Sequence, residues 1–267
     1  MTGTITHIVA VASGKGGVGK STVTANLALA MAARGKRVGV LDADIYGPSQ
    51  AQMMGIAPGT RPKIVDEKTM LPLEAHGMKI MSMAFLTDIE TAMAWRGPMV
   101  SGAFQQLLDQ TRWGELDYLF IDMPPGTGDI QLTLAQKVPV AGAVIVTTPQ
   151  DIALLDARRG IEMFRKVKVP VLGVIENMST HVCSQCGHEE AVFGDGGGER
   201  IAAQYDTRLL GQLPLTMSIR EQVDGGRPTV VAAPDSDIAT TFARMAGEVD
   251  ESLGARVAST GPSISFE

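Results

Sequence analysis

Three features are scarce in this sequence of 267 residues, and each shortage excludes a class of protein. Cysteine occurs twice, which is too few for the disulfide framework that holds small secreted domains together. Lys and Arg number 23 against 29 Asp and Glu, and a net charge of −6 argues against a nonspecific nucleic-acid binder, which needs a basic surface. No apolar run approaches the roughly 18–20 residues that cross a bilayer. We therefore expect neither a nucleic-acid partner nor a membrane span.

We also expect no secretory signal, because no positively charged segment precedes the short apolar stretch of MTGTITHIVAVAS. Together with the low cysteine content, this predicts a soluble protein of the reduced cytoplasm. Hydrophobic residues make up 45% of the chain and charged residues 19%, which is typical of a globular protein. The 30 glycines and only 4% aromatic residues suit a fold with many tight turns.

Short apolar runs alternate with helical segments along most of the chain. The runs predict buried strands at 7–12, 38–41, 79–84, 118–121, 143–147, 169–175 and 209–213. Helices are predicted from the first Gly-rich loop to Gly35, and at 99–110, 130–137, 152–167, 198–204 and 237–253. This alternation predicts an α/β fold with a mostly parallel, twisted sheet and helices on both faces.

Two stretches depart from this alternation. Residues 56–78 contain three prolines and a polar middle, and we expect an inserted loop or a small hairpin there. Residues 254–267 lack periodicity and predict a flexible C-terminal tail. Because no linker or repeat divides the rest, we expect one domain over residues 1–253.

The most specific motif is a phosphate-binding loop. GKGGVGKS, from Gly14 to Ser21, matches G-x-x-x-x-G-K-[ST] and lies between a predicted strand and a predicted helix, where an ordinary Gly-rich turn is the weaker explanation. The glycines allow backbone N–H groups to approach phosphate, and the helix N-terminus adds a partial positive charge. Lys20 would bind the β- and γ-phosphates of a nucleotide, and the Ser21 hydroxyl would bind Mg²⁺.

Three carboxylates end strands near this loop. Asp122 is the last residue of the apolar strand YLFID, at a position where a Mg²⁺-bound water needs a hydrogen-bond acceptor. The PPGTGD segment that follows could sense the γ-phosphate. Asp42 and Asp44 end the second strand. One of them could act on Mg²⁺ through water and the other could orient the attacking water, whereas a solvated turn is the alternative for each.

Lys15 is a second lysine inside the phosphate loop. Its side chain starts too close to the loop to fold back easily onto its own nucleotide. One physical solution is contact with the γ-phosphate of a nucleotide bound to a partner subunit, as an arginine finger makes in trans.

Cys183 and Cys186 form a C-x-x-C pair in a loop rich in glycine. One pair supplies two thiolates, and a tetrahedral metal or a [4Fe–4S] cluster needs four ligands. His181 and His188 could complete a zinc site within one chain, or a two-fold dimer could bring two pairs around one metal centre. A redox dithiol, a loop disulfide and two free structural cysteines are the remaining readings.

Taken in order, the motifs resemble a known family. KGGVGKST resembles the deviant Walker A motif of the MinD/ParA/nitrogenase-iron-protein superfamily. Six further segments narrow the resemblance: DADIYGPS, WRGPMVSGA, DMPPGTGD, TTPQDIALLDARRGIEMF, ENMS and the C-x-x-C loop. Together they resemble the Mrp/ApbC family of iron–sulfur cluster carrier ATPases over about residues 7–250. Some relatives carry an N-terminal domain or an N-terminal four-cysteine motif, and we expect neither here.

This resemblance implies a MinD-like P-loop NTPase fold and a set of residue roles. Lys15 would contact phosphates across an ATP-dependent homodimer, Asp44 would position the attacking water, and Asn177 and Pro214 would contact the base. Cys183 and Cys186 would hold a [4Fe–4S] cluster shared between two subunits. The residues expected to bind ATP or ADP in the loop are Gly14, Lys15, Gly16, Gly17, Val18, Gly19, Lys20, Ser21 and Thr22.

The resemblance implies an ATP-dependent carrier that transfers its cluster to apo iron–sulfur proteins and hydrolyses ATP slowly, using Lys15, Lys20 and Asp44. Ser21, Asp42 and Asp122 would bind Mg²⁺ directly or through water. The alternative function is a MinD- or ParA-like positioning ATPase with a structural zinc site, and zinc could also occupy the cysteines in aerobic preparations. The tail GARVASTGPSISFE lacks the basic amphipathic helix that membrane cycling needs.

Overall fold

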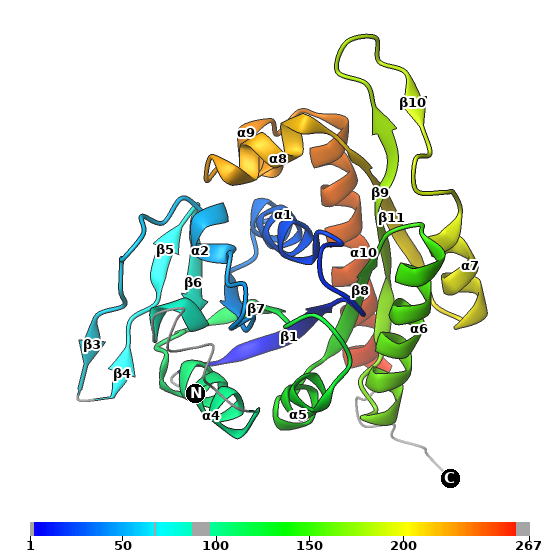
Figure 1. Cartoon of the computed structure of the whole chain (residues 1–267). Coiled ribbons are helices and arrows are strands. Elements are labelled where there is room, and N and C mark those ends of the chain that lie inside the picture. Colours follow the sequence, from blue (N-terminus) through cyan, green and yellow to red (C-terminus); the bar gives the residue numbers. More distant parts are fainter. Residues whose placement is uncertain (1–2, 67, 87–96, 260–267) are drawn as a thin grey trace.

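The computed structural model describes residues 3–66, 68–86 and 97–259, and its centre is a nine-stranded sheet (Figure 1). Seven strands run parallel in the order β11, β9, β8, β1, β7, β2 and β6. Their bounds are Leu209–Leu215, Val171–Val182, Gly142–Thr147, Ile5–Ala12, Leu116–Asp122, Val38–Asp42 and Met78–Ser82. Two short antiparallel strands, β10 (Glu189–Glu190) and β5 (Leu73–Ala75), pair with β9 and β6. The predicted α/β fold with a mostly parallel sheet is confirmed.

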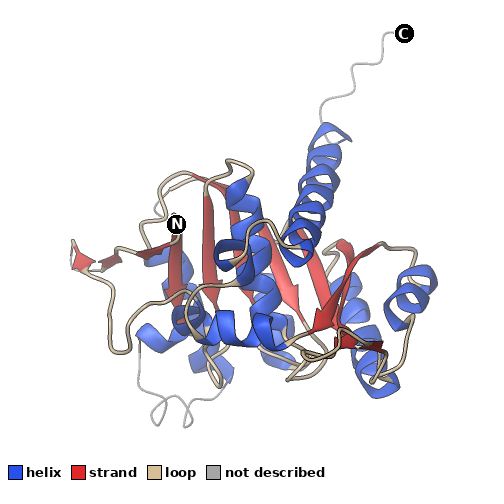
Figure 2. Ribbon diagram, turned by 90° about the horizontal axis from the view of Figure 1, so that it is seen from above, coloured by secondary structure: helices blue, strands red, loops and turns tan. Residues whose placement is uncertain are grey.

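Helices cover both faces of the sheet, as Figure 2 shows from above. On one face lie α1 (Lys20–Ala33), α8 (Met217–Asp224), α9 (Thr229–Ala232) and α10 (Asp237–Ser259). On the other lie α4 (Gly97–Gln110), α5 (Asp129–Lys137), α6 (Asp151–Lys166) and α7 (Gly197–Gln204). No helix in the described parts of the chain is long and apolar enough to cross a membrane.

Strand alternation divides the apolar core in two. In β1, Ile8 and Ala10 face one core, whereas Val9 and Val11 face the other. This follows from the two-residue period of a strand, because successive side chains point to opposite faces. The first core includes Phe104 of α4, and the second packs the sheet against α1 and α10. With both faces covered, the central strands read as continuous apolar runs.

The predicted insertion at 56–78 contains the hairpin that the prolines indicated. Strands β3 (Ile64–Val65) and β4 (Thr69–Met70) pair antiparallel, and β5 follows them onto the sheet edge. The strand predicted at 79–84 ends earlier, at Ser82. Its last residues form a short 3₁₀ helix, η1 (Met83–Phe85), which the Ser82 hydroxyl caps by accepting from the Ala84 amide.

Several further elements differ from the sequence prediction. The C-terminal helix α10 does not end at residue 253 but continues to Ser259, so the non-periodic tail begins later than expected, and residues 260–267 lie outside the described residues. Strand β9 runs to Val182, seven residues past its predicted end. Helices α8 and α9, and the one-turn helix α2 (Gln50–Met53), were not predicted. The first two residues of the WRGPMVSGA motif, Trp95 and Arg96, also lie outside the described residues.

Candidate functional site

The phosphate-binding motif occupies the turn between β1 and α1, at the carboxyl end of the parallel strands. Gly17 and Gly19 have φ values of +81° and +82°, a left-handed conformation that glycine adopts without strain. Beside the loop lies a cavity of about 250 Å³. It is lined by Ser13, Gly16, Gly17, Gly19, Lys20, Ser21, Thr22, Asp44, Gly47, Ser49, Met53 and Pro125. Backbone N–H groups, side-chain hydroxyls and the Lys20 ammonium therefore line a site that suits nucleotide phosphates.

Two neighbouring elements hold the loop closely. A Cβ on Gly14 would lie 2.1 Å from backbone atoms of Asp156 in α6, so only glycine fits there. A Cβ on Gly19 would lie 2.1 Å from Nδ2 of Asn177, which donates a hydrogen bond to the Val18 carbonyl at 2.9 Å. Asn177 is on β9, and its partner Leu213 on β11 precedes Pro214. The two predicted base-contacting residues are thus brought together beside the phosphate loop.

Asp122 is fully buried, and its carboxylate accepts hydrogen bonds from three side chains. Lys20 Nζ lies 2.6 Å from Oδ1, Thr24 Oγ1 lies 3.2 Å from the same oxygen, and Gln50 Nε2 lies 2.9 Å from Oδ2. A buried charge pair is stable only when such partners satisfy the remaining lone pairs. The predicted neighbours Lys20 and Asp122 are therefore in direct contact, and a bound phosphate would share the Lys20 ammonium with Asp122.

Asp42 is aligned with Asp122 on the adjacent strand, but its carboxylate is engaged with backbone. Oδ2 accepts from the amides of Ser49 and Gln50 at 2.9 and 3.0 Å, and Oδ1 accepts from the Asp44 amide at 3.1 Å. Burial, reinforced by the nearby charge of Asp122, raises the pKa of Asp42. Asp42 thus anchors the segment between β2 and α2, and its action on Mg²⁺ stays a prediction.

Asp44 lines the cavity, and its Oδ2 lies 3.9 Å from Lys20 Nζ. Burial raises the pKa of Asp44, whereas the Lys20 charge opposes that rise. Together with the hydroxyls of Ser21 and Ser49, this carboxylate offers the oxygen donors that Mg²⁺ prefers. The donor set therefore fits a magnesium ion beside nucleotide phosphate.

Gln50 is a site residue that the sequence did not reveal. It is fully buried, and its amide nitrogen donates both to the Ser21 carbonyl at 2.8 Å and to Asp122 at 2.9 Å. Its Oε1 is buried and has no hydrogen-bond partner among the described residues. Gln50 thus links α2 to the phosphate loop and to the buried carboxylate. A single glutamine carries no sequence pattern, and only its place directly after the DADIYGPS motif could have singled it out.

Lys15 is tied to the loop by its backbone, because its carbonyl accepts a hydrogen bond from the Ser13 hydroxyl at 2.8 Å. Within the described residues, its ammonium makes no ion pair or hydrogen bond. Its predicted role across a dimer stays a prediction.

The cysteine pair lies in a hairpin that projects from the sheet edge between β9 and β10 (Figure 1). The Cys183 amide donates to the His188 carbonyl, and the Gly187 amide donates to the Cys183 carbonyl, both at 2.9 Å. Hydrogen bonding from the backbone of Gln185 and Cys186 lowers the pKa of the Cys183 thiol. Cys183 is partly exposed and Cys186 is exposed, so this turn presents thiolate ligands to the outside.

The four-ligand zinc site considered for a single chain is not assembled in this structure. Among residues 3–66, 68–86 and 97–259, no three His, Cys, Asp or Glu side chains come together to hold a metal ion. His181 is in the paired part of β9, and His188 is exposed at the end of the turn.

Comparisons with known proteins show the family of this chain. A family model described as ParA, NUBPL iron-transfer P-loop NTPase, matches residues 4–250. The iron–sulfur cluster carrier protein of Pseudomonas fragi is 69% identical over 242 residues, covering 91% of this chain and 84% of that protein. The iron–sulfur cluster transfer protein NUBPL of Mus musculus is 50% identical over 247 residues, covering 92% and 77%.

Solved structures give the same picture of the fold. A nucleotide-binding protein from Archaeoglobus fulgidus in complex with ADP superposes with a TM-score of 0.76 and 38% identity, covering 89% of this chain and 92% of that one. The cell division ATPase MinD of Pyrococcus furiosus superposes with a TM-score of 0.69 at 23% identity, covering 92% and 99%, which shows a shared fold. The resemblance to iron–sulfur cluster carrier ATPases is confirmed, and the chain belongs to the NUBPL iron-transfer family of P-loop NTPases.

Proposed function

We propose that this protein carries a [4Fe–4S] cluster between two copies of its cysteine hairpin and transfers it to apo-proteins. The observation that supports this most is the turn at Cys183, which two backbone hydrogen bonds close and which places both cysteines at an exposed edge. Each chain offers two thiolates, and a cubane cluster takes four. A two-fold homodimer presents two identical hairpins, which makes up the full set. The cytoplasm suits this cargo because the thiols have to stay reduced.

ATP binding and slow hydrolysis at the phosphate loop would drive the cycle. Lys20 would hold the β- and γ-phosphates, while Ser21 and Asp122 hold Mg²⁺ directly or through water. Mg²⁺ would neutralise charge that develops on the phosphates. Asp44, at the cavity wall, would orient the attacking water, and Lys15 would bind the phosphates of the partner's nucleotide.

Strand β9 gives the two sites a physical connection. Asn177 touches the phosphate loop at Val18, and Cys183 follows Val182, the last residue of the same strand. The strand is held on both sides, by β8 and by β11. A shift of the loop on nucleotide exchange would therefore be transmitted along a rigid strand to the cysteine turn. Such a shift would change the separation of the two paired hairpins and with it the lability of the cluster.

Anaerobic reconstitution with iron and sulfide tests the cargo. We expect about four iron and four sulfide per dimer, lost in the Cys183→Ala/Cys186→Ala variant and kept in Ser184→Ala, which alters the same turn without removing a thiol. The loaded protein should then transfer its cluster to a chelator-stripped ferredoxin of the [4Fe–4S] type. About one tight zinc per chain with no iron uptake would instead support a positioning ATPase with a structural zinc site.

Light scattering tests the dimer. With Mg²⁺ and ATP, the hydrolysis-impaired Asp44→Asn variant should have twice the 28.2 kDa mass of one chain. Adding Lys15→Ala should restore the single-chain mass, because it removes the cation that would reach the partner's phosphates. Adding Lys36→Ala, on the α1–β2 turn, is the matched control and should leave the dimer intact. A dimer that survives Lys15→Ala would contradict the assigned role of Lys15.

A further inference from the structure

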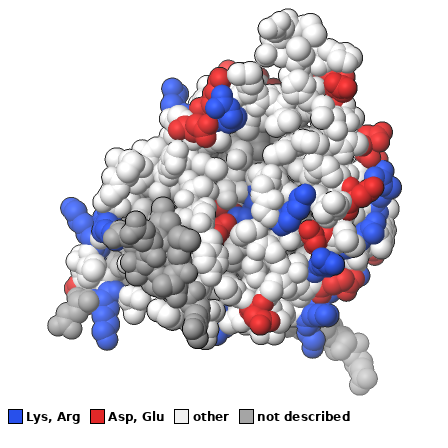
Figure 3. All heavy atoms as spheres, in the orientation of Figure 1, with Lys and Arg blue, Asp and Glu red and all other residues white. Residues whose placement is uncertain are grey.

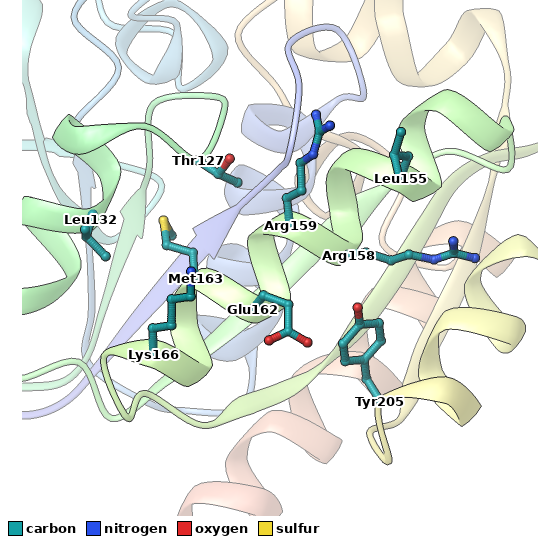
Figure 4. A pocket seen from close by; sticks show the side chains of 9 residues that line it. All are labelled: Thr127, Leu132, Leu155, Arg158, Arg159, Glu162, Met163, Lys166 and Tyr205. Atoms are coloured by element: carbon teal, nitrogen blue, oxygen red, sulfur yellow. The ribbon is translucent and has the colours of Figure 1, made fainter.

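A second cavity lies on the outer side of α6, away from the phosphate loop (Figure 4). Its volume is about 390 Å³, within the range of ligand-binding sites. Leu132 of α5 forms one side, Tyr205 after α7 forms the other, and α6 runs between them. Thr127, from the loop after β7, closes one end. We call this cavity the α6 groove.

The polar groups of the α6 groove are mostly donors. Its described lining residues include three cations, Arg158, Arg159 and Lys166, and one carboxylate, Glu162. This local excess of positive charge contrasts with the net charge of −6 of the chain. Figure 3 shows both signs of charge over α6 and α7 on this side, so the positive excess belongs to the groove rather than to the whole face.

Two of these cations have no partner within the described part of the chain. Arg159 pairs with Asp156 at 2.9 Å, but Arg158 and Lys166 make no ion pair or hydrogen bond there. The Nε of Arg158 is moreover buried without an acceptor. A buried donor left unpaired costs free energy, which a ligand's carboxylate would recover by accepting from it.

Apolar side chains complete the groove. Leu155 is 47% exposed, and it shares the lining with Leu132 and Met163. The Tyr205 ring is held in place, because the Arg165 guanidinium lies 4.9 Å from its centre and donates to the Tyr205 carbonyl at 2.5 Å. Apolar contacts flanked by unpaired cations suit a segment that carries both leucine-like and acidic side chains.

Helix α6, which runs through the groove, also contacts the phosphate loop and α7. Helix α6 packs against the phosphate loop at Gly14, and the Gly126 amide, next to Thr127, donates to the Ser13 carbonyl at 2.9 Å. On its other side, α7 is the first helix after the cysteine hairpin and packs on α6, with Gly197 against Leu154. Figure 1 shows the cysteine hairpin projecting beyond α6, so a protein seated in the groove would reach the hairpin by extending along α6 and α7.

We propose that the α6 groove docks an acidic, amphipathic segment of the apo-protein that receives the cluster. This inference rests on the proposed carrier function and names the chemistry by which a recipient is recognised. The segment's carboxylates pair with Arg158 and Lys166, and its apolar side chains pack on Leu155 and Met163. We assign the groove to a recipient protein because its cations and apolar side chains are complementary to an acidic, amphipathic segment.

Fluorescence anisotropy with a defined peptide tests the groove. The probe is a fluorescein-labelled octapeptide of alternating leucine and glutamate, and its control replaces every glutamate by glutamine. We expect the glutamate peptide to bind wild-type protein about tenfold more tightly or better, with affinity falling as salt rises. The Arg158→Glu/Lys166→Glu variant should lose at least tenfold in affinity. The Lys63→Glu/Lys68→Glu variant makes the same charge change on the exposed β3–β4 hairpin and should bind as the wild type does.

Cluster transfer separates this inference from the proposed function. The groove variant should keep wild-type iron content and ATPase activity but transfer its cluster more slowly to stripped ferredoxin. If wild-type protein takes up no cluster, the carrier function fails whatever the peptide does. Equal binding of the two peptides, or unchanged binding by the groove variant, would overturn the groove proposal. So would a groove variant whose only change is its oligomeric mass, because the groove would then join copies of this chain. The milder Arg158→Gln/Lys166→Gln variant repeats the test if charge reversal impairs folding.

Discussion

At the scale of single residues, the nucleotide site is organised around one buried carboxylate. Asp122 accepts from Lys20, Thr24 and Gln50, which come from two different helices. Lys20 and Thr24 are both on α1, whereas Gln50 reaches Asp122 from α2. Each donor restrains the orientation of the carboxylate that would face Mg²⁺, because ligand orientation depends on the groups that hydrogen-bond to the ligand.

Gln50→Leu tests this restraint with little change in side-chain volume. It removes the donor to Asp122, so we expect the ATPase kcat to fall by about tenfold, as loss of outer-sphere hydrogen bonds does at metal sites. The free energy of unfolding should change by less than about 2 kcal/mol, since the variant also removes the unpartnered Oε1. Steady-state kinetics and urea unfolding measure the two effects.

Gln105→Leu is the matched control for this residue. It removes a glutamine-to-carboxylate hydrogen bond of 2.7 Å, to Asp109, within α4 and away from the nucleotide cavity. Its kcat should equal that of the wild type. A Gln50→Leu enzyme with unchanged kcat would show that α2 does not restrain Asp122 during hydrolysis.

At the scale of elements, the cysteine hairpin depends on one backbone conformation. Gly187 has a φ of +70°, and its amide donates to the Cys183 carbonyl to close the turn. A residue with a Cβ pays roughly 1–2 kcal/mol in this left-handed region. The free space around Gly187 means that the strain is conformational and not a steric clash.

Gly187→Ala should therefore loosen the turn without disturbing the ATPase. A strain of about 1 kcal/mol corresponds to roughly fivefold faster loss of iron to a chelator after anaerobic loading. Gly77→Ala provides a control with the same backbone demand, since Gly77 has a φ of +77° and open space in the β5–β6 turn. Equal rates of iron loss in the two variants would show that the closed turn does not govern cluster retention.

At the scale of the whole molecule, α10 is joined to the sheet by a polar cluster at the end opposite the nucleotide. Asp250 accepts from the Tyr118 hydroxyl at 2.5 Å and from Lys36 at 3.0 Å. Burial alone would raise the pKa of Asp250, but these hydrogen bonds outweigh it and lower the pKa below its usual value. The cluster connects the α1–β2 turn, β7 and the C-terminal helix.

The lowered pKa of Asp250 predicts a pH-dependent stability. Its folded pKa lies below the unfolded value of about 3.9, so its contribution is present above roughly pH 4 and is lost as pH falls through the folded pKa. Asp250→Asn should lower the free energy of unfolding by about 1 kcal/mol at pH 7 and by progressively less below pH 4. Urea unfolding across this range measures the difference. Asp235→Asn changes an exposed carboxylate that has no ion pair among the described residues, so it should show no such dependence. Parallel curves for wild type and Asp250→Asn would contradict the prediction.

Much of the candidate site could be predicted from local patterns. A phosphate loop needs glycines, a lysine and a hydroxyl at fixed spacing between a strand and a helix, so Gly14–Ser21 could be recognised from the sequence. Asp122 could be placed beside it because carboxyl ends of parallel strands meet at one sheet edge, and the structure brings Lys20 to it. The C-x-x-C pair could be recognised from its spacing in the same way. Two cysteines supply too few ligands, however, to decide which of the possible sites they form.

The remaining features depend on contacts between segments distant in sequence. Gln50 became part of the site because α2 folds over the phosphate loop, and β9 continues through the polar residues NMSTHV because β11 and β10 supply its hydrogen bonds. The α6 groove likewise needs α5, α6 and Tyr205 side by side. Apolar periodicity and motif spacing are local properties of the chain, so they specify strands, helices and the phosphate loop. Hydrogen-bond partners and cavities arise only when the packed sheet brings separate segments together, which explains why no single stretch of sequence contained them.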